Sequence, residues 1–523
     1  MENDKYAQMI LVNGQVVTMD DAETVAQAVA VKDGRIWMVG ADDKIKQTCG
    51  SHTEKIDLKG KTVLPGFIEA HTHVDLTGMM TSDLVVNCRI PPLKNNEEVL
   101  KRLKEKVQNT PKGQLILAHG RWVQPNLKKE QLDEIAPEHP VILKYGMHLY
   151  LLNSFALKKH GISTDRPTPE EFFEKAPGAQ IQRNPLTGEP IGFLGDAWDF
   201  LYPGSPSPLS YQDTKAGIIN GLNTYVRAGV TSITEFVDYK ESVQIYHDLR
   251  RNNQLPARLQ MVICVHGLHK TTNLDALLQA GLTTGFGDEW ISFGGAKIFV
   301  DLGVETTLTS IQLKEMVMRA HQAGIRVYMH ANTRMAQDMA LAAVEAAAER
   351  MPQIKLRHRL EHMGNRLIDL NYFDRVKNAD AIALPTAYFM NVGRSFQEGQ
   401  ELFLFRTMLD KRLCVPGNSD TGGTEPQAPN PLYQVWCMAA RKDREGRDVY
   451  PEERLTVEEG LRLYTRHSAF GALQEDTKGS IEPGKLADFV VLEKDPLRCP
   501  LDEVCDIKVD KTIVGGTIVF QAN

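Results

Sequence analysis

Eight short apolar runs in the middle of the chain are the feature that most constrains its fold. Most have the length of a strand, and several end in polar residues or in residue types common at catalytic sites. Helix-period segments such as 310–323, 334–350 and 430–442 separate most of them. Strands that alternate with helices in eight repeats are typical of a (β/α)8 TIM barrel, an α/β fold. The runs lie at 62–71, 229–235, 258–264, 296–300, 325–330, 359–362, 381–385 and 413–420.

The stretch between the first and second runs is too long for a single strand-to-helix unit. From about residue 80 to 210 it contains a helical part at 95–107 and a Pro- and Gly-rich part at 167–208. Because chemistry in such a barrel takes place at the carboxyl ends of the strands, an insertion after the first strand would lie over the barrel mouth. We therefore expect residues 80–210 to form a lid subdomain that faces the substrate.

Both ends of the chain predict strands without intervening helices. Asn13-Gly14 and Asp33-Gly34 are hairpin turns between apolar runs, and glycine turns also separate the strand-like runs after residue 479. We expect residues 1–63 and 471–523 to pair into one small β-sandwich domain. Residues 64–470 then form the barrel with its insertion.

His71 and His73 stand at the end of the first apolar run. In an extended backbone, residues i and i+2 project to the same side, so both imidazoles can reach one point, as metal ligands must. Two ordinary histidines in a polar turn would be the simpler interpretation of this pair alone. However, His330, His362 and Asp420 end three further runs, and together they favour a metal site.

This set of residue types suits a catalytic metal site. Imidazoles and a carboxylate can bind a divalent metal and leave a position open for water. We assign Asp420 two roles, as a carboxylate that touches the metal and as the general base for a metal-activated water. His330 and His362 either bind a second metal or, in a one-metal enzyme, help to orient the substrate carbonyl.

Lys297 lies in the fourth run among apolar neighbours, and two interpretations of it are open. In the first, its stem is buried while its ammonium group reaches solvent or a carboxylate. In the second, carbon dioxide carbamylates the lysine, and the product bridges two metals.

Composition excludes several classes of protein. Of the 523 residues, 42% are hydrophobic and 24% are charged, which excludes a disordered or fibrous chain. The net charge of −7 and the lack of a basic tract give no electrostatic case for nucleic acid or an anionic membrane. Seven scattered cysteines without a CxxC pair argue against a disulfide framework. With no signal-peptide pattern and no membrane-length apolar run, we expect a cytoplasmic protein.

Several segments together resemble the amidohydrolase superfamily. They are Val63-Leu64-Pro65-Gly66-Phe67-Ile68-Glu69-Ala70-His71-Thr72-His73, the late Gly-Ser-Ile-Glu-Pro-Gly-Lys-Leu-Ala-Asp segment at 479–488, and Asn418-Ser419-Asp420. The segments 296–299, 357–362 and 152–157 are similar to the YtcJ-like branch of metal-dependent hydrolases. The resemblance covers essentially the whole chain.

The resemblance implies a metal-dependent hydrolase of C–N bonds such as amides and formamides, with a barrel and a β-sandwich made from both termini. It places metal ligands at His71, His73, His330, His362 and Asp420, and a lysine that can be carbamylated at Lys297. It also implies one or two divalent metals per chain, most often zinc, and suggests a homodimer. The loops at 301–305 and 330–334 depart from the pattern of the branch and border the site, so they bear on the substrate class.

Three residues are candidates for substrate contacts. His148 lies in the insertion, near a segment that approaches the substrate in the family, and a pocket contact and a structural hydrogen bond are both open. Trp122 and Trp198 could line an aromatic pocket, although large aromatic side chains more often belong to the core. Glu235 ends the second run and either supports the ligands or is structural.

We predict a metal-dependent amidohydrolase that uses a metal-activated water to cleave an amide-like, non-peptide C–N bond of a small molecule. Hydrolysis of an ester, a lactone or a carbamate passes through a similar intermediate and stays open as an alternative. A non-catalytic barrel that serves as a scaffold would predict a broken ligand set, whereas every ligand type is present. Gly294-Gly295 and Gly422-Gly423 form neither GxGxxG nor a P-loop, which argues against a nucleotide-binding enzyme.

Overall fold

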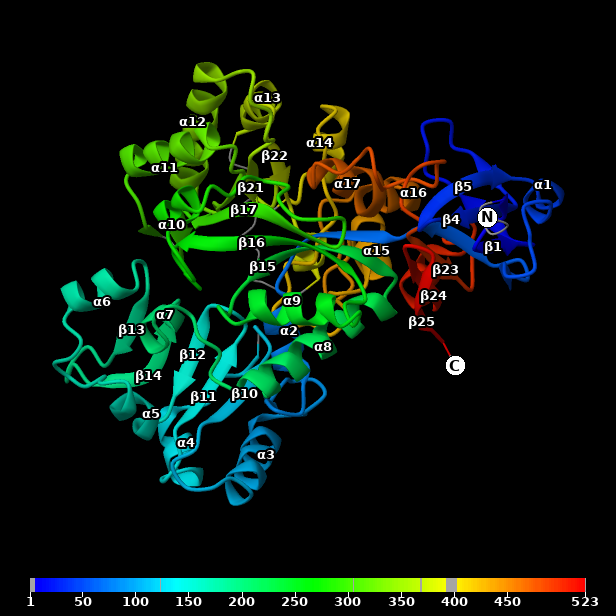
Figure 1. Cartoon of the computed structure of the whole chain (residues 1–523). Helices are drawn as coiled ribbons and strands as arrows, with labels where there is room; N and C mark the ends of the chain where they lie inside the picture. Colours follow the sequence, from blue (N-terminus) through cyan, green and yellow to red (C-terminus); the bar gives the residue numbers. More distant parts are fainter. Residues whose placement is uncertain (1–4, 123, 304, 367–368, 392–401, 523) are drawn as a thin grey trace.

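A curled parallel sheet of seven strands forms the centre of the molecule (Figure 1). The computed structural model describes residues 5–122, 124–303, 305–366, 369–391 and 402–522. The strand order across the sheet is β22-β21-β20-β17-β16-β15-β8, so each strand lies beside its neighbour in the chain. The strands are β8 (Phe67–Thr72), β15 (Val230–Val237), β16 (Arg258–His266), β17 (Ile291–Phe299), β20 (Val327–His330), β21 (Arg359–Glu361) and β22 (Ile382–Leu384).

Seven of the eight predicted runs are strands of this sheet, and the eighth, 413–420, does not form a regular ladder. Its Gly417 carbonyl accepts a hydrogen bond from the Ala70 N–H at 3.0 Å, and its Asp420 N–H donates to the His71 carbonyl at 2.7 Å. On the other side, Asn418 Nδ2 donates to the Pro385 carbonyl at 2.7 Å. The segment therefore contacts β8 and the end of β22, the two edges of the sheet.

Helices follow most of the strands and pack around the sheet. The three helices predicted from periodicity are present as α11 (Ser310–Gln322), α12 (Arg334–Arg350) and α15 (Pro431–Ala440). Thr309 and Thr333 cap the first two, since each side chain accepts a hydrogen bond from a backbone N–H of the first turn. The other helices around the sheet are α8 (Tyr211–Arg227), α9 (Ser242–Arg251), α10 (Leu274–Gln279), α13 (Asn371–Asn378), α14 (Phe405–Asp410), α16 (Val457–Arg462) and α17 (Ser468–Gly471).

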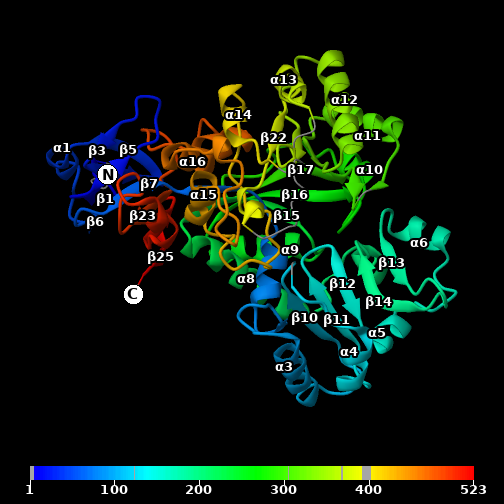
Figure 2. The same ribbon diagram turned by 180° about the vertical axis from the view of Figure 1, so that it is seen from behind.

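Two smaller sheets at one end of the molecule contain both ends of the chain (Figure 2). One has the order β5 (Arg35–Gly40), β4 (Ala28–Lys32), β1 (Met9–Val12) and β6 (Glu54–Asp57). The other joins β25 (Thr517–Gln521), β24 (Val509–Val514) and β23 (Phe489–Leu492) to β7 (Thr62–Pro65), β2 (Gln15–Val17) and β3 (Val25–Ala26). Leu11, Val31 and Phe489 belong to one buried cluster that draws on both sheets. The chain ends therefore share a core, and β7 leads directly into β8.

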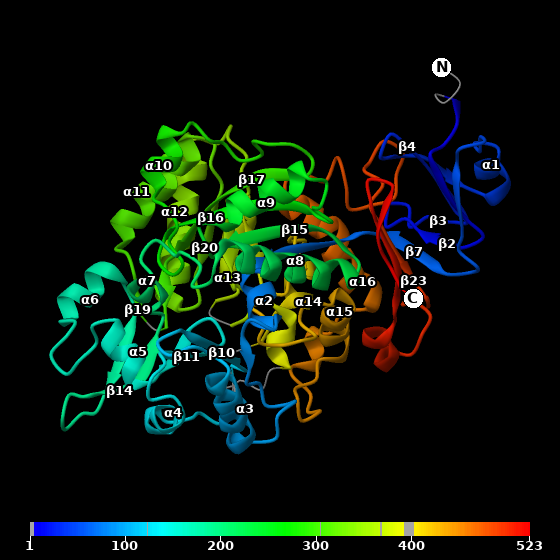
Figure 3. The same ribbon diagram turned by 60° about the horizontal axis from the view of Figure 1, so that its bottom comes forward.

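The predicted insertion forms a sheet of its own between α2 (Val74–Thr81) and α8, below the central sheet in Figure 1 and in front of it in Figure 3. Its strand order is β13 (Gln180–Arg183), β14 (Pro190–Gly195), β12 (Leu149–Leu152), β11 (Val141–Tyr145), β10 (Ile116–Gly120) and β9 (Val86–Asn87). The helices are α3 (Asn96–Gln108), α4 (Lys129–Ile135), α5 (Ser154–Lys159), α6 (Pro169–Lys175) and α7 (Trp198–Leu201). Tyr150 and Trp198 of the insertion share a buried cluster with Cys264 and Phe299 near the carboxyl ends of β16 and β17. The insertion thus packs on that end of the sheet.

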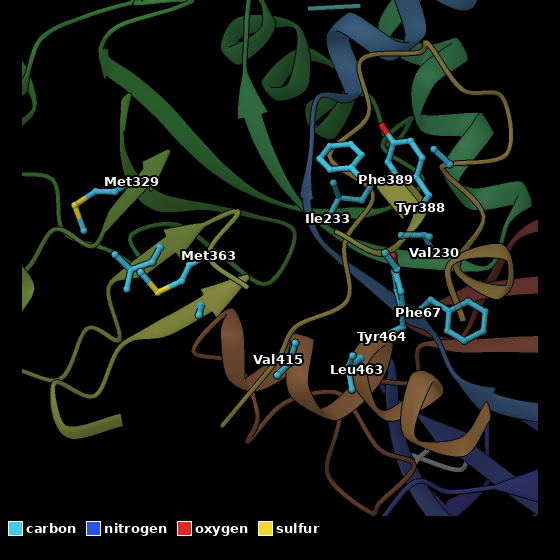
Figure 4. Close-up of a cluster of buried hydrophobic side chains, with 14 of the residues drawn as sticks. Phe67, Val230, Ile233, Met329, Met363, Tyr388, Phe389, Val415, Leu463 and Tyr464 are labelled. Carbon is cyan, nitrogen blue, oxygen red and sulfur yellow. The ribbon is translucent and has the colours of Figure 1, made fainter. Parts of the chain in front are cut away.

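Close packing fixes the segments that carry the candidate ligands. A Cβ atom at Gly221 of α8 would lie 2.4 Å from the carbonyl oxygen of Val74, the first residue of α2. A Cβ atom at Gly417 would lie 2.4 Å from Cδ2 of Tyr464, which Figure 4 shows in the buried cluster with Phe67. Because real Cβ atoms do not approach this closely, only glycine fits at either position. Both contacts lie within a few residues of His73 or Asp420.

Lys144 is fully buried where the insertion meets the central sheet. Its Nζ atom lies 4.3 Å from the ring centroid of Trp198 and has no hydrogen-bond partner among the described residues. Burial disfavours the charged amine and lowers the pKa of Lys144 to about 8, although Asp238 and Asp75 oppose the shift. Protonated Lys144 therefore destabilises the folded state.

We predict that Lys144→Met stabilises the protein in a pH-dependent way. The ordinary pKa of 10.5 exceeds the folded value of about 8, so at roughly 1.4 kcal/mol per pKa unit the penalty is about 3 kcal/mol below pH 8. Between pH 8 and 10.5 the folded state releases the proton before the unfolded state does, so the penalty disappears as pH rises. Urea unfolding from pH 7 to 10.5 measures this advantage of the variant. Lys112→Met, at a side chain that is 75% exposed, is the control, and an advantage that did not shrink with pH would contradict the account.

Candidate metal centre

Three predicted ligands converge at the carboxyl end of the central sheet. Nε2 of His71 lies 3.4 Å from Oδ1 of Asp420, and Nε2 of His73 lies 3.5 Å from the same oxygen. Each of these residues offers one atom within 4.8 Å of the others. His71 ends β8 with Thr72, and His73 lies at the start of α2. The i and i+2 spacing therefore brings both imidazoles to one carboxylate.

Two buried carboxylates orient these imidazoles. Nδ1 of His71 contacts Oε2 of Glu361, and Nδ1 of His73 lies 2.9 Å from Oδ2 of Asp238. With Nδ1 engaged, the Nε2 atom of each ring faces Asp420. Carboxylates commonly hold metal-binding histidines in this way, because the second hydrogen bond fixes the ring and its tautomer.

Glu361 is itself held by a buried ion pair. Its oxygens accept hydrogen bonds from Nε and Nη2 of Arg359 at 2.7 and 2.8 Å. Arg359 Nη1 also donates to the Ala70 carbonyl at 2.9 Å. This guanidinium therefore ties β21 to β8 directly beside His71, and the paired charges satisfy one another inside the protein.

The electrostatics of the group favour an ionised Asp420. Burial would raise the pKa of Asp420, but the imidazoles of His71 and His362 outweigh it and hold the pKa well below its usual range. Burial likewise opposes the charged form of His73, yet Asp238 and Asp420 raise its pKa to about 10. A metal ion bound at Nε2 would compete with that proton, so we expect metal binding to release protons.

His362 and His330 lie on the other side of Asp420. Nδ1 of His362 is 3.5 Å from Oδ2 of Asp420, and the rings of His330 and His362 have centroids 4.5 Å apart. Nε2 of His330 lies 3.0 Å from Nδ2 of Asn332 and 3.7 Å from Oδ1 of Asp301. One oxygen of Asp420 thus faces His71 and His73, and the other faces His362.

Lys297 is buried inside the sheet beside this group, with 3% of its surface exposed. Its Nζ atom lies 4.6 Å from the ring centroid of Phe236, and Phe236 in turn stacks on His71 at 3.8 Å. Burial lowers the pKa of Lys297, against the pull of Glu361 and Asp420. Its amine therefore does not reach solvent. Pairing with a carboxylate and carbamylation both stay open as interpretations of Lys297.

A cavity of about 390 Å³ opens over the group. His330, His362 and Asp420 line it from the sheet. Trp122, His148 and Asp196 line it from the insertion, and Gly303, Asn332, Arg366 and Phe389 complete the described lining. Nδ1 of His148 also contacts Oδ1 of Asp196 at 2.5 Å, so its pocket contact and its structural hydrogen bond are both present. The structure puts Trp198 elsewhere: it is fully buried in the core between insertion and sheet and is not among the described residues that line the cavity. Its ring packs in the hydrophobic core, as large aromatic side chains commonly do.

A larger cavity, of about 820 Å³, lies at the amino ends of the last strands. Ala381, Leu413 and Lys478 are among the residues that line it. Its described lining includes none of the candidate metal ligands. We therefore identify the site by its chemistry rather than by cavity size.

The residues present fit a divalent metal. Two imidazole nitrogens and a carboxylate oxygen meet within ligand reach, the ring orientations are fixed by carboxylates, and the cavity leaves access for water. Nitrogen and oxygen donors of this kind are typical of catalytic zinc sites.

Two residues that support the ligands were not predicted from the sequence. Asp238 directly follows β15 and Glu361 directly precedes His362. A signal was present for Glu361, because Arg359 and Glu361 at i and i+2 in a buried strand must share one face and therefore pair. Glu235 has a different role, since its carboxylate accepts hydrogen bonds from the backbone N–H of Val74 at 2.7 Å and of the next residue at 3.1 Å. It holds the N-terminus of α2.

The fold and the site together define a metal-dependent hydrolase, with imidazoles and a carboxylate at the carboxyl ends of a curled parallel sheet. Comparison with known proteins gives the family. The Amidohydro_3 model of the amidohydrolase family matches residues 54–520. The chain belongs to this family, and the predicted resemblance is confirmed.

The relatives cover the chain almost completely. N-substituted formamide deformylase of Arthrobacter pascens is 29% identical over an alignment that is 556 positions long with its gaps and spans 98% of each chain. YtcJ of Bacillus subtilis (strain 168) is 26% identical over 97% of this chain and 98% of its own. The solved structure of an uncharacterized metal-dependent hydrolase from Pyrococcus horikoshii has a TM-score of 0.73 at 21% identity, over 95% of this chain and 99% of the other. The predicted enzyme class, a hydrolase of non-peptide C–N bonds in small molecules, is supported in the same way. Among the described residues, no helix has the length and apolar character needed to span a membrane.

We predict that Asp238→Asn weakens metal binding without unfolding the protein. The amide keeps the size of the side chain but removes the charge that holds Nδ1 of His73, and losses of such supporting groups typically reduce metal affinity by roughly 10- to 100-fold. Competition with a chromophoric chelator measures the dissociation constant. Asp199→Asn is the control, because Asp199 is also buried but binds the backbone N–H of His269 instead of a ligand. Equal affinities in the two variants would contradict the role of Asp238.

Proposed function

We propose that this protein hydrolyses small secondary amides, with N-substituted formamides as the first substrate class to examine. The observation that carries the proposal is the convergence of His71 and His73, each oriented by a buried carboxylate, on Asp420 at the floor of a 390 Å³ cavity. The substrate class rests on the deformylase relative, whose sequence aligns over 98% of both chains.

The proposed architecture is a (β/α)8 barrel that the segment 413–420 completes as the eighth strand position. Residues 1–63 and 471–523 form the β-sandwich, residues 64–470 form the barrel, and residues 80–210 form the lid. The hydrogen bonds of Gly417 and Asp420 to β8 and of Asn418 to Pro385 support a closed barrel. The shared core of the two terminal sheets supports the sandwich.

In the proposed site His71, His73 and Asp420 would hold a first metal ion, with zinc as the expected ion. His330 and His362 would hold a second. Lys297 would bridge the two after its neutral amine adds to carbon dioxide and loses a proton, which gives a carbamate. The buried, aromatic surroundings of Lys297 support this reaction, because they favour the neutral amine. Such ions polarise a carbonyl and lower the pKa of a bound water toward about 7.

The protein's own residues transfer the protons and orient the substrate. Asp420 is ionised, so it can accept a proton from the attacking water and return it to the leaving nitrogen. The water oxygen first bonds to the carbonyl carbon, the C–N bond then breaks as the nitrogen receives the proton, and the products are a carboxylic acid and an amine. His330 and His362 line the cavity beside Asp420, so in a one-metal enzyme one of them could instead orient the carbonyl oxygen.

We predict that Asp420→Asn keeps most of the bound metal but lowers kcat by roughly 10²- to 10⁴-fold, the usual contribution of a general base. Steady-state kinetics with N-methylformamide, together with metal analysis of the same samples, measures both effects. A variant with near-wild-type turnover would show that another group is the base.

Matched amide and ester substrates test the bond that is cleaved. We expect the wild type to hydrolyse an N-alkylformamide many orders of magnitude faster than the uncatalysed reaction. The rate enhancement, which is the catalysed rate divided by the uncatalysed rate, should be larger for this amide than for the matching alkyl formate. If the enzyme is instead an ester, lactone or carbamate hydrolase, the rate enhancement should be larger for that substrate than for the amide. A protein that binds metal but turns over none of these would revive the scaffold interpretation.

A further inference from the structure

Trp122 forms part of the cavity wall above Asp420, although it belongs to the insertion. Its ring lies edge to face with Phe389 at a centroid distance of 6.0 Å, and 5.6 Å from the ring of His148. Aromatic rings give a cavity its main apolar contact surface. Trp122 therefore contributes apolar contact surface to the cavity wall above Asp420.

Arg121, the residue before Trp122, makes a two-point ion pair with Glu425. Its Nε donates to Oε1 of Glu425 at 2.8 Å, and its Nη2 contacts Oε2. The two side chains are only 11% and 10% exposed. Two-point contacts between a guanidinium and a carboxylate fix direction as well as distance. Because Glu425 lies five residues after Asp420, the pair joins the insertion's wall to the loop that carries the candidate base.

The surroundings of this pair are packed. Arg89 Nη1, also from the insertion, donates to the Gly423 carbonyl at 3.1 Å. Gly146 lies between the two loops, since a Cβ atom built there would be 3.6 Å from both Thr424 Cγ2 and the ring of Trp122. A displacement of the loop after Asp420 would therefore displace Trp122, and a displacement of Trp122 would displace that loop.

We propose that the Arg121–Glu425 pair is a positioning device that fixes Trp122 over the cavity and thereby sets a preference for substrates whose leaving amine carries an apolar substituent. The preference rests on the proposed function, because it is observed through amide hydrolysis. Neither Arg121 nor Glu425 is among the described residues that line the cavity. Both act through Trp122 and neither is a catalytic residue.

Glu425→Gln tests the proposal in the full chain, since it keeps the shape of the side chain and removes its charge. We expect the ratio of kcat/KM for N-butylformamide to that for formamide to fall by about tenfold or more, the effect of losing one or more methylene contacts in an apolar pocket. The loss should lie in KM for the butyl substrate, and kcat for formamide should stay within about twofold of wild type. Arg121→Lys, which keeps the charge but not the two-point geometry, should shift the ratio in the same direction.

Two controls separate positioning from a general loss of stability. Glu138→Gln breaks an exposed ion pair with Lys112 in the same insertion, 2.8 Å long, and should leave the ratio unchanged. Arg444→Gln removes the other guanidinium near Glu425, 3.5 Å from its Oε1, but keeps both Arg121 contacts, and should also leave the ratio unchanged. Lower stability with an unchanged ratio would overturn the proposal, because it would make the pair merely structural.

Fluorescence of Trp122 gives a readout that does not depend on the reaction. The difference between the spectra of the wild type and Trp122→Phe isolates this side chain. In Glu425→Gln we expect that emission to shift to longer wavelength and to be quenched more strongly by acrylamide, as the ring becomes more exposed. If the wild type hydrolyses no formamide, the proposed function fails, but the fluorescence still tests whether the Arg121–Glu425 pair positions Trp122. An unchanged Trp122 spectrum would overturn the proposal in either case.

Discussion

The hydrogen bond from the Asp420 N–H to the His71 carbonyl, 2.7 Å long, joins the first and last sheet positions at the point where the chemistry is located. It brings the carboxylate of one segment to the imidazoles of another that is about 350 residues distant in the chain. The neighbouring bond from Ala70 to Gly417 holds the same two segments in register, and the lack of a side chain at Gly417 leaves room for the Tyr464 ring. Without this junction the candidate ligands would not meet.

Buried carboxylates then orient the imidazoles at this junction. Arg359 neutralises Glu361, which leaves Glu361 able to hold His71, and Asp238 holds His73 in the same manner. Each imidazole is turned so that its second nitrogen faces Asp420. The insertion contributes Trp122, His148 and Asp196 to the wall of the cavity over the site. The backbone register therefore places the imidazoles, the buried carboxylates then orient their rings, and the cavity for the substrate forms above them.

Much of this organisation was predictable from the sequence, because strand ends and the i, i+2 spacing of His71 and His73 are local properties. The irregular path of 413–420 was not, since it depends on Pro416, which has no N–H to donate, and on contacts with two distant strands. Asp238 was missed because an acidic residue after a strand has many uses, and only the fold shows that it faces His73. Trp122 and Trp198 look alike in sequence, yet only Trp122 lines the cavity. Which surface a tryptophan covers is decided by tertiary packing.

We propose that the convergent imidazoles, with Asp420 and Lys297, hold divalent metal. The most direct test is the metal content per chain of wild-type protein and of Lys297→Ala, both purified without chelator. We expect about two divalent ions per wild-type chain and fewer in the variant, because a bridging carbamate is lost. One ion in both proteins would leave a mononuclear hydrolase with a structural Lys297, against the bridging role. No tightly bound ion in either protein would contradict the metal centre itself.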